Sequence, residues 1–186
     1  MRRPLLALWL TMAICLQACA ATISRPDVFN LNDNAPYTLG SGDRVRIIVF
    51  GQDSITNSYA VDGSGQVSLP LIGFVRADGL TTGELEHAIE ARLRNGFLRE
   101  PRVAAEVEAF RPFFVLGEVT TAGQYPFVNG MTVQKAIAIA GGFTPRARQT
   151  SADITRMVGR ESVTGAVPLS QPLRPGDTVI VRERFF

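Results

Sequence analysis

The stretches LGSGDRV (residues 39–45) and LRPGDTV (residues 173–179) share the pattern L-x-x-G-D-x-V and lie toward opposite ends of a 186-residue chain. In each, a Gly-Asp pair, Gly42-Asp43 or Gly176-Asp177, precedes a run typical of a strand. Gly before Asp suits a tight turn with a positive φ, in which the Asp carboxylate accepts a main-chain N–H. Two unrelated turns would look alike locally, but the repeated spacing predicts two modules of related construction.

The first module combines strands with one helix. Val45, Ile47 and Val49 alternate along 44–49 and predict a half-buried strand, and the run 103–108 alternates similarly. Thr81 and Glu84 have the spacing of a capping box, which predicts a helix after Thr81 that ends near Gly96. The carboxylates at 84, 86 and 90 are typical of a solvated helix face. Those at 106 and 108 are typical of a solvated strand face.

The second module is expected to start at Arg111-Pro112, since the residue before proline is pushed out of the helical region. The segment 133–140 is apolar nearly all round and predicts a buried helix, and 178–181 predicts a last strand. The fold class is therefore α+β, with modules at 37–110 and 111–186 of about 75 residues each. Modules this small need contact with each other or with another subunit to bury enough surface.

The N-terminus has the features of a signal peptide. Met1-Arg2-Arg3 is positive and residues 4–16 are apolar, too short for the ~20 residues of a spanning helix. Leu16-Gln17-Ala18-Cys19 resembles a bacterial lipobox, although Gln17 departs from the usual residue; Cys19 is then the lipidated first residue. Cleavage after Ala18-Cys19-Ala20 is the alternative, and the product would then be periplasmic. The expected layout is a signal peptide over 1–18 and a lipid-anchored tether over 19–36.

Composition excludes several function classes. Without Arg2 and Arg3 the chain has 17 basic and 17 acidic residues, so we expect no binding of nucleic acid. Both cysteines, Cys15 and Cys19, lie in the leader region, and His87 is the only histidine. We therefore predict no metal site, no cofactor and no catalytic residues.

A family resemblance emerges from several motifs together. Residues 37–110 resemble the polysaccharide export domain of bacterial outer-membrane export lipoproteins, through YTLGSGD (37–43), VDGSGQVSLPLIG (61–73), GLT (79–81) and EPRV (100–103). Residues 113–181 resemble the soluble ligand-binding β-grasp domain that follows it, through FVLGEV (114–119), GQYP (123–126), AGGF (140–143) and PGD (175–177).

This resemblance implies a subunit of a homo-oligomeric ring that conducts polysaccharide through the periplasm without catalysis. It implies an inner-membrane chain-length regulator, or polysaccharide co-polymerase, as partner, and attachment to the periplasmic face of the outer membrane. The largest members add a β-grasp copy and a terminal amphipathic helix that lines a pore, whereas this sequence stops at Phe186. We therefore expect no pore from this chain alone. A separate outer-membrane barrel protein, or a pore formed only in the assembled complex, is expected to complete the path.

Eighteen of the 19 basic residues are arginine. A base-composition bias of the genome explains this; alternatively, Arg44, Arg46, Arg92 and Arg94 are candidate contacts to an acidic glycan. A second functional hypothesis is a periplasmic lipoprotein that binds a glycan or small ligand and senses it. An enzyme acting on polysaccharide is a third, but no nucleophile–base pair or phosphate loop is evident.

The lipobox gives a direct prediction. Cys19→Ser removes the thiol that carries the lipid, so the protein is expected to leave the membrane fraction and to lose labelling by a fatty-acid probe. Unchanged membrane association and labelling in this variant would contradict lipidation and favour cleavage after Ala20.

Overall fold

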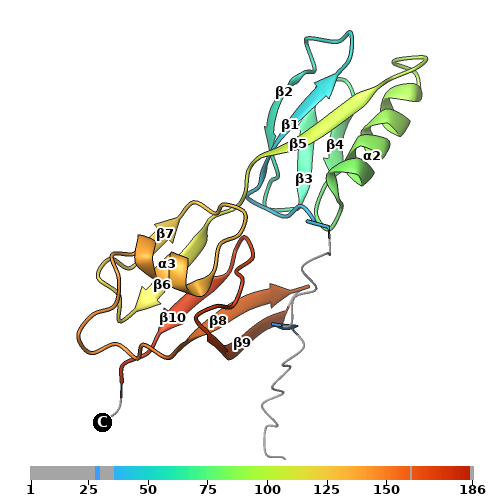
Figure 1. Ribbon diagram of the computed structural model, residues 1–186. Coiled ribbons are helices and arrows are strands. Elements are labelled where there is room, and N and C mark those ends of the chain that lie inside the picture. The colour runs from blue at the N-terminus through green and yellow to red at the C-terminus, as the bar shows by residue number, and fades with distance from the viewer. Residues whose placement is uncertain (1–27, 30–35, 160, 185–186) are drawn as a thin grey trace, which may run out of the picture.

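The chain forms two bodies, which Figure 1 shows one above the other with a narrow connection. The computed structural model describes residues 28–29, 36–159 and 161–184. Each body has its own sheet and its own apolar core. Within the described residues, two helices and several sheets in two bodies confirm the predicted α+β class. Cys19, the predicted signal peptide and most of the predicted tether lie outside the described residues.

The first body, which we call the export body (residues 36–110), contains a three-stranded sheet, a two-stranded sheet and one helix. Its elements are β1 (Arg44–Val49), β2 (Asn57–Ala60), β3 (Gln66–Leu69), β4 (Gly73–Arg76), α2 (Thr82–Arg94) and β5 (Val103–Ala109). The antiparallel order β2-β1-β5 leaves β1 in the centre. As predicted from alternation, Val45, Ile47 and Val49 point into the core and are almost completely buried.

Helix α2 starts and ends as its sequence predicts. Thr81 and Glu84 form the capping box, in which the Glu84 carboxylate accepts from the Thr81 N–H at 2.8 Å. The helix ends at Arg94, and Gly96 follows with a φ of 100°. Leu85, Ile89 and Leu93 face the core of the export body.

The sequence predicts a solvated polar face on α2, but two carboxylates of this face accept hydrogen bonds from the main chain of a strand. Glu86 Oε1 accepts a hydrogen bond from the Ala105 N–H at 2.7 Å, and Glu90 Oε1 accepts one from the Val103 N–H at 3.1 Å. Both N–H groups belong to β5, which is an edge of the three-stranded sheet. The two carboxylates, one helical turn apart, therefore cover main-chain donors that an edge strand would otherwise present to another chain.

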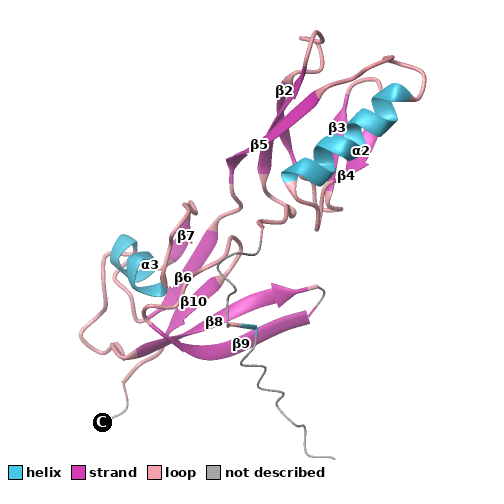
Figure 2. Cartoon of the chain, turned by 45° about the vertical axis from the view of Figure 1, so that its right-hand side comes forward, coloured by secondary structure: helices cyan, strands magenta, loops and turns pink. Residues whose placement is uncertain are grey.

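The second body, which we call the β-grasp body (residues 111–184), is built on a five-stranded sheet. Its elements are β6 (Phe113–Gly117), β7 (Gly123–Tyr125), α3 (Val133–Ile139), β8 (Ser151–Val158), β9 (Glu161–Pro168) and β10 (Thr178–Val181). The strand order is β7-β6-β10-β8-β9, with β10 parallel to β6 and the other pairs antiparallel. Figure 2 shows α3 beside β6 and β7.

The expectation that 133–140 is buried on all sides was wrong. Val133, Ala136 and Ile137 are buried, but Ile139 is 51% exposed. The reason is that a helix of this length packs only one face against the sheet, and its apolar residues do not all lie on that face.

Part of the segment predicted to be a tether packs against the β-grasp body. Phe29 belongs to its core and is 8% exposed, and Val28 packs beside it. The tether over 19–36 therefore remains a prediction for its other residues only. Among the described residues, no helix is long and apolar enough to cross a membrane.

The hydrogen bonds from the β5 edge to the carboxylates of α2 can be tested by substitution. Glu86→Ala leaves the Ala105 N–H without its acceptor and is expected to cost on the order of 1 kcal/mol of unfolding free energy. Glu86→Gln keeps an acceptor oxygen and should restore most of that loss, and Arg94→Ala, at an exposed position in the last turn of the same helix, serves as control. Urea unfolding measures the effect, and equal stability of Glu86→Ala and Arg94→Ala would contradict it.

Candidate functional site

The two Gly-Asp turns have the same geometry. The Asp43 N–H donates to the Gly40 carbonyl at 3.1 Å, and the Asp177 N–H donates to the Arg174 carbonyl at 3.1 Å. Gly42 has a φ of 93° and Gly176 one of 85°, which suits position i+2 of a type II turn. In both turns the Asp carboxylate also accepts from the N–H three residues earlier, at 2.8 Å. The sequence repeat is therefore also a structural repeat.

Each of the two aspartates is buried and paired with one arginine. Asp43 has no exposed surface, and its Oδ2 lies 3.1 Å from Arg111 Nη1. Asp177 is 1% exposed and accepts from Arg156 through two bonds, to Nε at 2.9 Å and to Nη2 at 2.6 Å. A buried carboxylate is stable only with such partners, because its charge has lost the water that would solvate it.

Arg111 joins the two bodies. Its main-chain N–H donates to Asp43 Oδ1 at 2.7 Å in the export body, whereas its Nε donates to the Pro175 carbonyl at 3.1 Å in the β-grasp body. The Gly176 N–H donates to the Pro112 carbonyl at 3.1 Å beside it. The side chain fits because position 40 is glycine: a Cβ there would lie 2.4 Å from Arg111 Nη1.

Tyr37 completes this junction. Its hydroxyl donates to Asp43 Oδ2 at 2.5 Å and accepts from Arg111 Nη1 at 3.0 Å, and its ring lies edge-on to Phe110. Burial raises the pKa of Tyr37 well above its ordinary value, and the hydrogen bond to the Asp43 carboxylate raises it further. The phenol therefore stays protonated as the donor that the carboxylate needs.

The four arginines predicted as glycan contacts do not form one cluster. Arg44 and Arg46 lie on the exposed face of β1, where Arg44 Nε contacts Glu108 Oε2 at 3.1 Å and Arg46 is in register with Glu106. Arg92 and Arg94 lie in the last turn of α2. Within the described residues, Arg46 and Arg94 are the two of the four without a side-chain hydrogen bond or ion pair.

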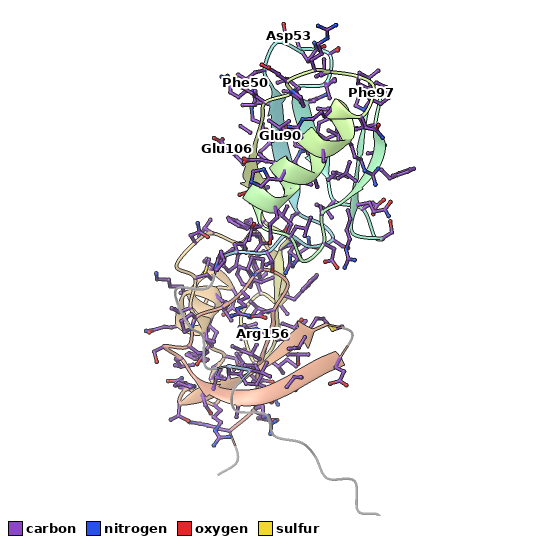
Figure 3. All side chains as sticks on the ribbon, turned by 90° about the vertical axis from the view of Figure 1, so that its right-hand side faces the viewer. Phe50, Asp53, Glu90, Phe97, Glu106 and Arg156 are labelled. Carbon is purple, nitrogen blue, oxygen red and sulfur yellow. The ribbon has the colours of Figure 1, made fainter. Side chains whose placement is uncertain are left out.

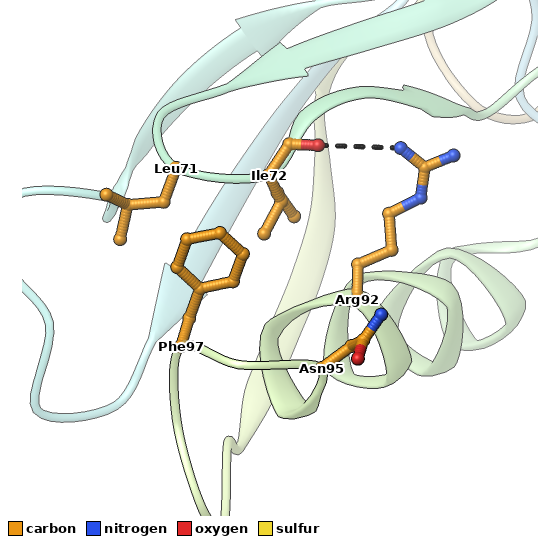
Figure 4. Close-up of a pocket in the computed structure, with 5 residues that line it drawn as sticks. All are labelled: Leu71, Ile72, Arg92, Asn95 and Phe97. Atoms are coloured by element: carbon orange, nitrogen blue, oxygen red, sulfur yellow. Dashed lines mark hydrogen bonds between the residues drawn. The ribbon is translucent and has the colours of Figure 1, made fainter.

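Arg92 lines a shallow pocket of about 380 Å³ together with Leu71, Ile72, Asn95 and Phe97 (Figure 4). Its Nη1 donates to the Phe74 carbonyl and, at 3.5 Å, to that of Ile72. Arg92 thus ties α2 to the β3–β4 hairpin.

The hairpin turn beside this pocket is strained. Leu71 has a φ of 70°, the one non-glycine residue with a positive φ among the described residues, and the Ile72 N–H donates to the Pro70 carbonyl at 2.9 Å. The side chains of Leu71 and Phe74 are each 60% exposed and that of Phe97 is 49% exposed. The outer end of the export body therefore presents apolar side chains to solvent.

Sequence reasoning found the turns but missed their partners. The sequence marks Arg111 only as the residue before a proline. It does not indicate that Tyr37 or Arg156 is a partner of an aspartate. In the described part of the chain, no three His, Cys, Asp or Glu side chains gather as a metal site would require. Glu108, one of the two carboxylates expected on a solvated strand face, forms an ion pair with Arg44.

Each of the two bodies matches a known protein domain. Residues 31–108 match the family described as "Polysaccharide biosynthesis/export protein", and residues 112–167 match the SLBB domain. The exopolysaccharide production protein ExoF of Rhizobium meliloti (strain 1021) is 32% identical over 145 residues, which cover 72% of this chain and 32% of that protein. The polysialic acid transport protein KpsD of Escherichia coli is 27% identical over 163 residues, which cover 81% of this chain and 29% of that protein. The chain thus spans about a third of the length of these relatives.

The raised pKa of Tyr37 predicts a specific loss of stability in alkali. Above pH ~10 the tyrosine of the unfolded chain ionises while Tyr37 in the folded protein keeps its proton, so its contribution is full below pH ~10 and falls as the pH rises further. In Tyr37→Phe, the drop in unfolding free energy between pH 8 and pH 10.5, measured with urea, is expected to be smaller than in the unchanged protein. An equal drop in both proteins would contradict this role.

Proposed function

Since the chain belongs to the polysaccharide biosynthesis/export protein family, we propose that it is a subunit of a translocon that exports exopolysaccharide or capsular polysaccharide. The observation that carries this proposal is the order of two domains, a polysaccharide export domain over 31–108 followed by an SLBB domain over 112–167. The relatives are named for exopolysaccharide production and for polysialic acid transport, which supports the same class of substrate.

Within this role the chain acts as a conduit without catalysis, assembled as a homo-oligomeric ring. An apolar sheet face supports subunit contact: Phe114 and Leu116 of β6 are 39% and 44% exposed, and Ile180 of β10 lies in register beside Leu116. Small bodies with such a face gain stability by covering it with another subunit. The charged groups Asp43, Asp177, Arg111 and Arg156 hold the two turns and the junction, which supports a role without chemistry.

The proposed location is the periplasmic face of the outer membrane, held by a lipid on Cys19, or the periplasm if the leader is cleaved after Ala20. The proposed partners are the passing polysaccharide, an inner-membrane chain-length regulator and a separate outer-membrane barrel protein. Of the candidate glycan contacts, Arg46 and Arg94 suit this role best, since their side chains are exposed and form no hydrogen bond or ion pair within the described residues.

The alternative is a lipoprotein that binds a glycan or small ligand and senses it. The exposed pocket formed by Leu71, Ile72, Arg92, Asn95 and Phe97 is the observation that favours this function. Its mixture of apolar and polar groups is typical of small-ligand sites.

Deletion of the gene separates the two functions. If the chain is a conduit, the cells are expected to retain polysaccharide in the periplasm and to release almost none, and the unchanged gene should restore release. If it senses, total synthesis falls and no polymer accumulates inside. Undiminished release of polysaccharide by the deletion strain would contradict both.

A further inference from the structure

Val28 and Phe29 contact the β-grasp body through hydrogen bonds and one aromatic ring. Arg156 Nη1 donates to the Val28 carbonyl at 3.0 Å, and Gln171 Nε2 donates to the Phe29 carbonyl at 2.6 Å. The Phe29 ring packs over Gly165, where a Cβ would lie 2.5 Å from the ring. Two main-chain carbonyls and one aromatic ring are thus bound by residues more than 120 positions later in the chain.

Arg156, which binds this segment, is buried in the β-grasp body (Figure 3). It is 4% exposed, its guanidinium carbon lies 5.6 Å from the centre of the Phe29 ring, and its other donors hold Asp177. If Val28 and Phe29 leave, Nη1 loses its acceptor and water reaches the ion pair. Water weakens a charge-assisted pair, because it competes for the same donors and acceptors.

The Asp177 turn connects this site to the junction between the bodies. The Arg156–Asp177 pair holds the turn at 174–177, and the Pro175 carbonyl of that turn accepts from Arg111. Arg111 in turn holds Asp43 and Tyr37 of the export body. Contacts therefore run without a gap from Val28, through one turn and two arginines, to the export body.

We propose that this surface of the β-grasp body, formed by Arg156, Gln171 and Gly165, is a recognition site for residues 28–29, and that its occupancy fixes the orientation of the two bodies. When the segment is bound, the 174–177 turn is held and presents its carbonyl to Arg111. When the segment leaves, the turn loosens and the two bodies sample several orientations.

The test is the distance between the two bodies, measured by electron–electron resonance in the full chain. Spin labels are attached to Ala91→Cys on α2 and Ala138→Cys on α3, two exposed helical positions, with Cys15 and Cys19 replaced by serine. The chain with Val28 and Phe29 unchanged is expected to give one narrow distance. Phe29→Ala and Gln171→Ala should each broaden it, as Arg111→Lys should at the junction itself.

Two matched variants serve as controls. Phe50→Ala removes a 62% exposed ring of the export body, and Arg146→Gln removes a surface arginine that pairs with Glu118 and Glu183. Both should leave the distance unchanged. Circular dichroism shows whether each variant is folded, and Gln171→Ala keeps the test informative if Phe29→Ala unfolds the β-grasp body.

The proposal is overturned if folded Gln171→Ala and Phe29→Ala keep the narrow distance while Arg111→Lys loses it. Binding of residues 28–29 would then have no effect on the junction between the bodies. A synthetic peptide of residues 25–32 gives a second measurement. Added to Phe29→Ala, it is expected to narrow the distance again, whereas the same peptide with Phe29→Ala should not. Absence of any effect at millimolar peptide would count against a recognition site.

Discussion

The carboxylate of Asp43 is the group on which the arrangement of this protein depends. It has no exposed surface and accepts hydrogen bonds from Tyr37, from the main chain of Gly40 and from both the main chain and the side chain of Arg111. A buried carboxylate that loses a charged partner costs ~3–5 kcal/mol, a large part of the stability of a small domain. The need to satisfy this charge therefore brings Arg111 to the export body, and Arg111 brings the turn of the β-grasp body with it.

Each Gly-Asp turn contains a buried aspartate that is paired with an arginine. Only the turns could be predicted from the sequence. The turns at Gly42-Asp43 and Gly176-Asp177, the alternation of Val45, Ile47 and Val49 and the capping box of α2 follow from residues that are neighbours in the chain. The partner of each aspartate does not: Asp43 meets Arg111 across 68 positions and Asp177 meets Arg156 across 21. The contacts of Val28 and Phe29 span 128 and 142 positions, in a segment whose composition resembled a tether. Glu86 and Glu90 looked solvated because the sequence does not reveal which main-chain donors lie opposite a helix face.

The family and the architecture give complementary support for a role in export. Residues 31–108 match the polysaccharide biosynthesis/export protein family and residues 112–167 match the SLBB domain, so the two matches cover most of the chain in sequence order. The architecture adds two small bodies, apolar side chains at the outer end of the export body and an apolar face on the sheet of the β-grasp body. Such surfaces are typical of proteins that assemble. The charged residues of the junction hold the two bodies together.

The proposed assembly into a ring can be tested by electron microscopy of the purified protein. We expect closed rings in which every subunit contributes an export body to one layer and a β-grasp body to the next, with the apolar face of β6 and β10 between subunits. Single particles of monomer size at concentrations well above those in the cell, with Phe114 and Leu116 open to solvent, would contradict ring assembly and favour a monomeric binding protein.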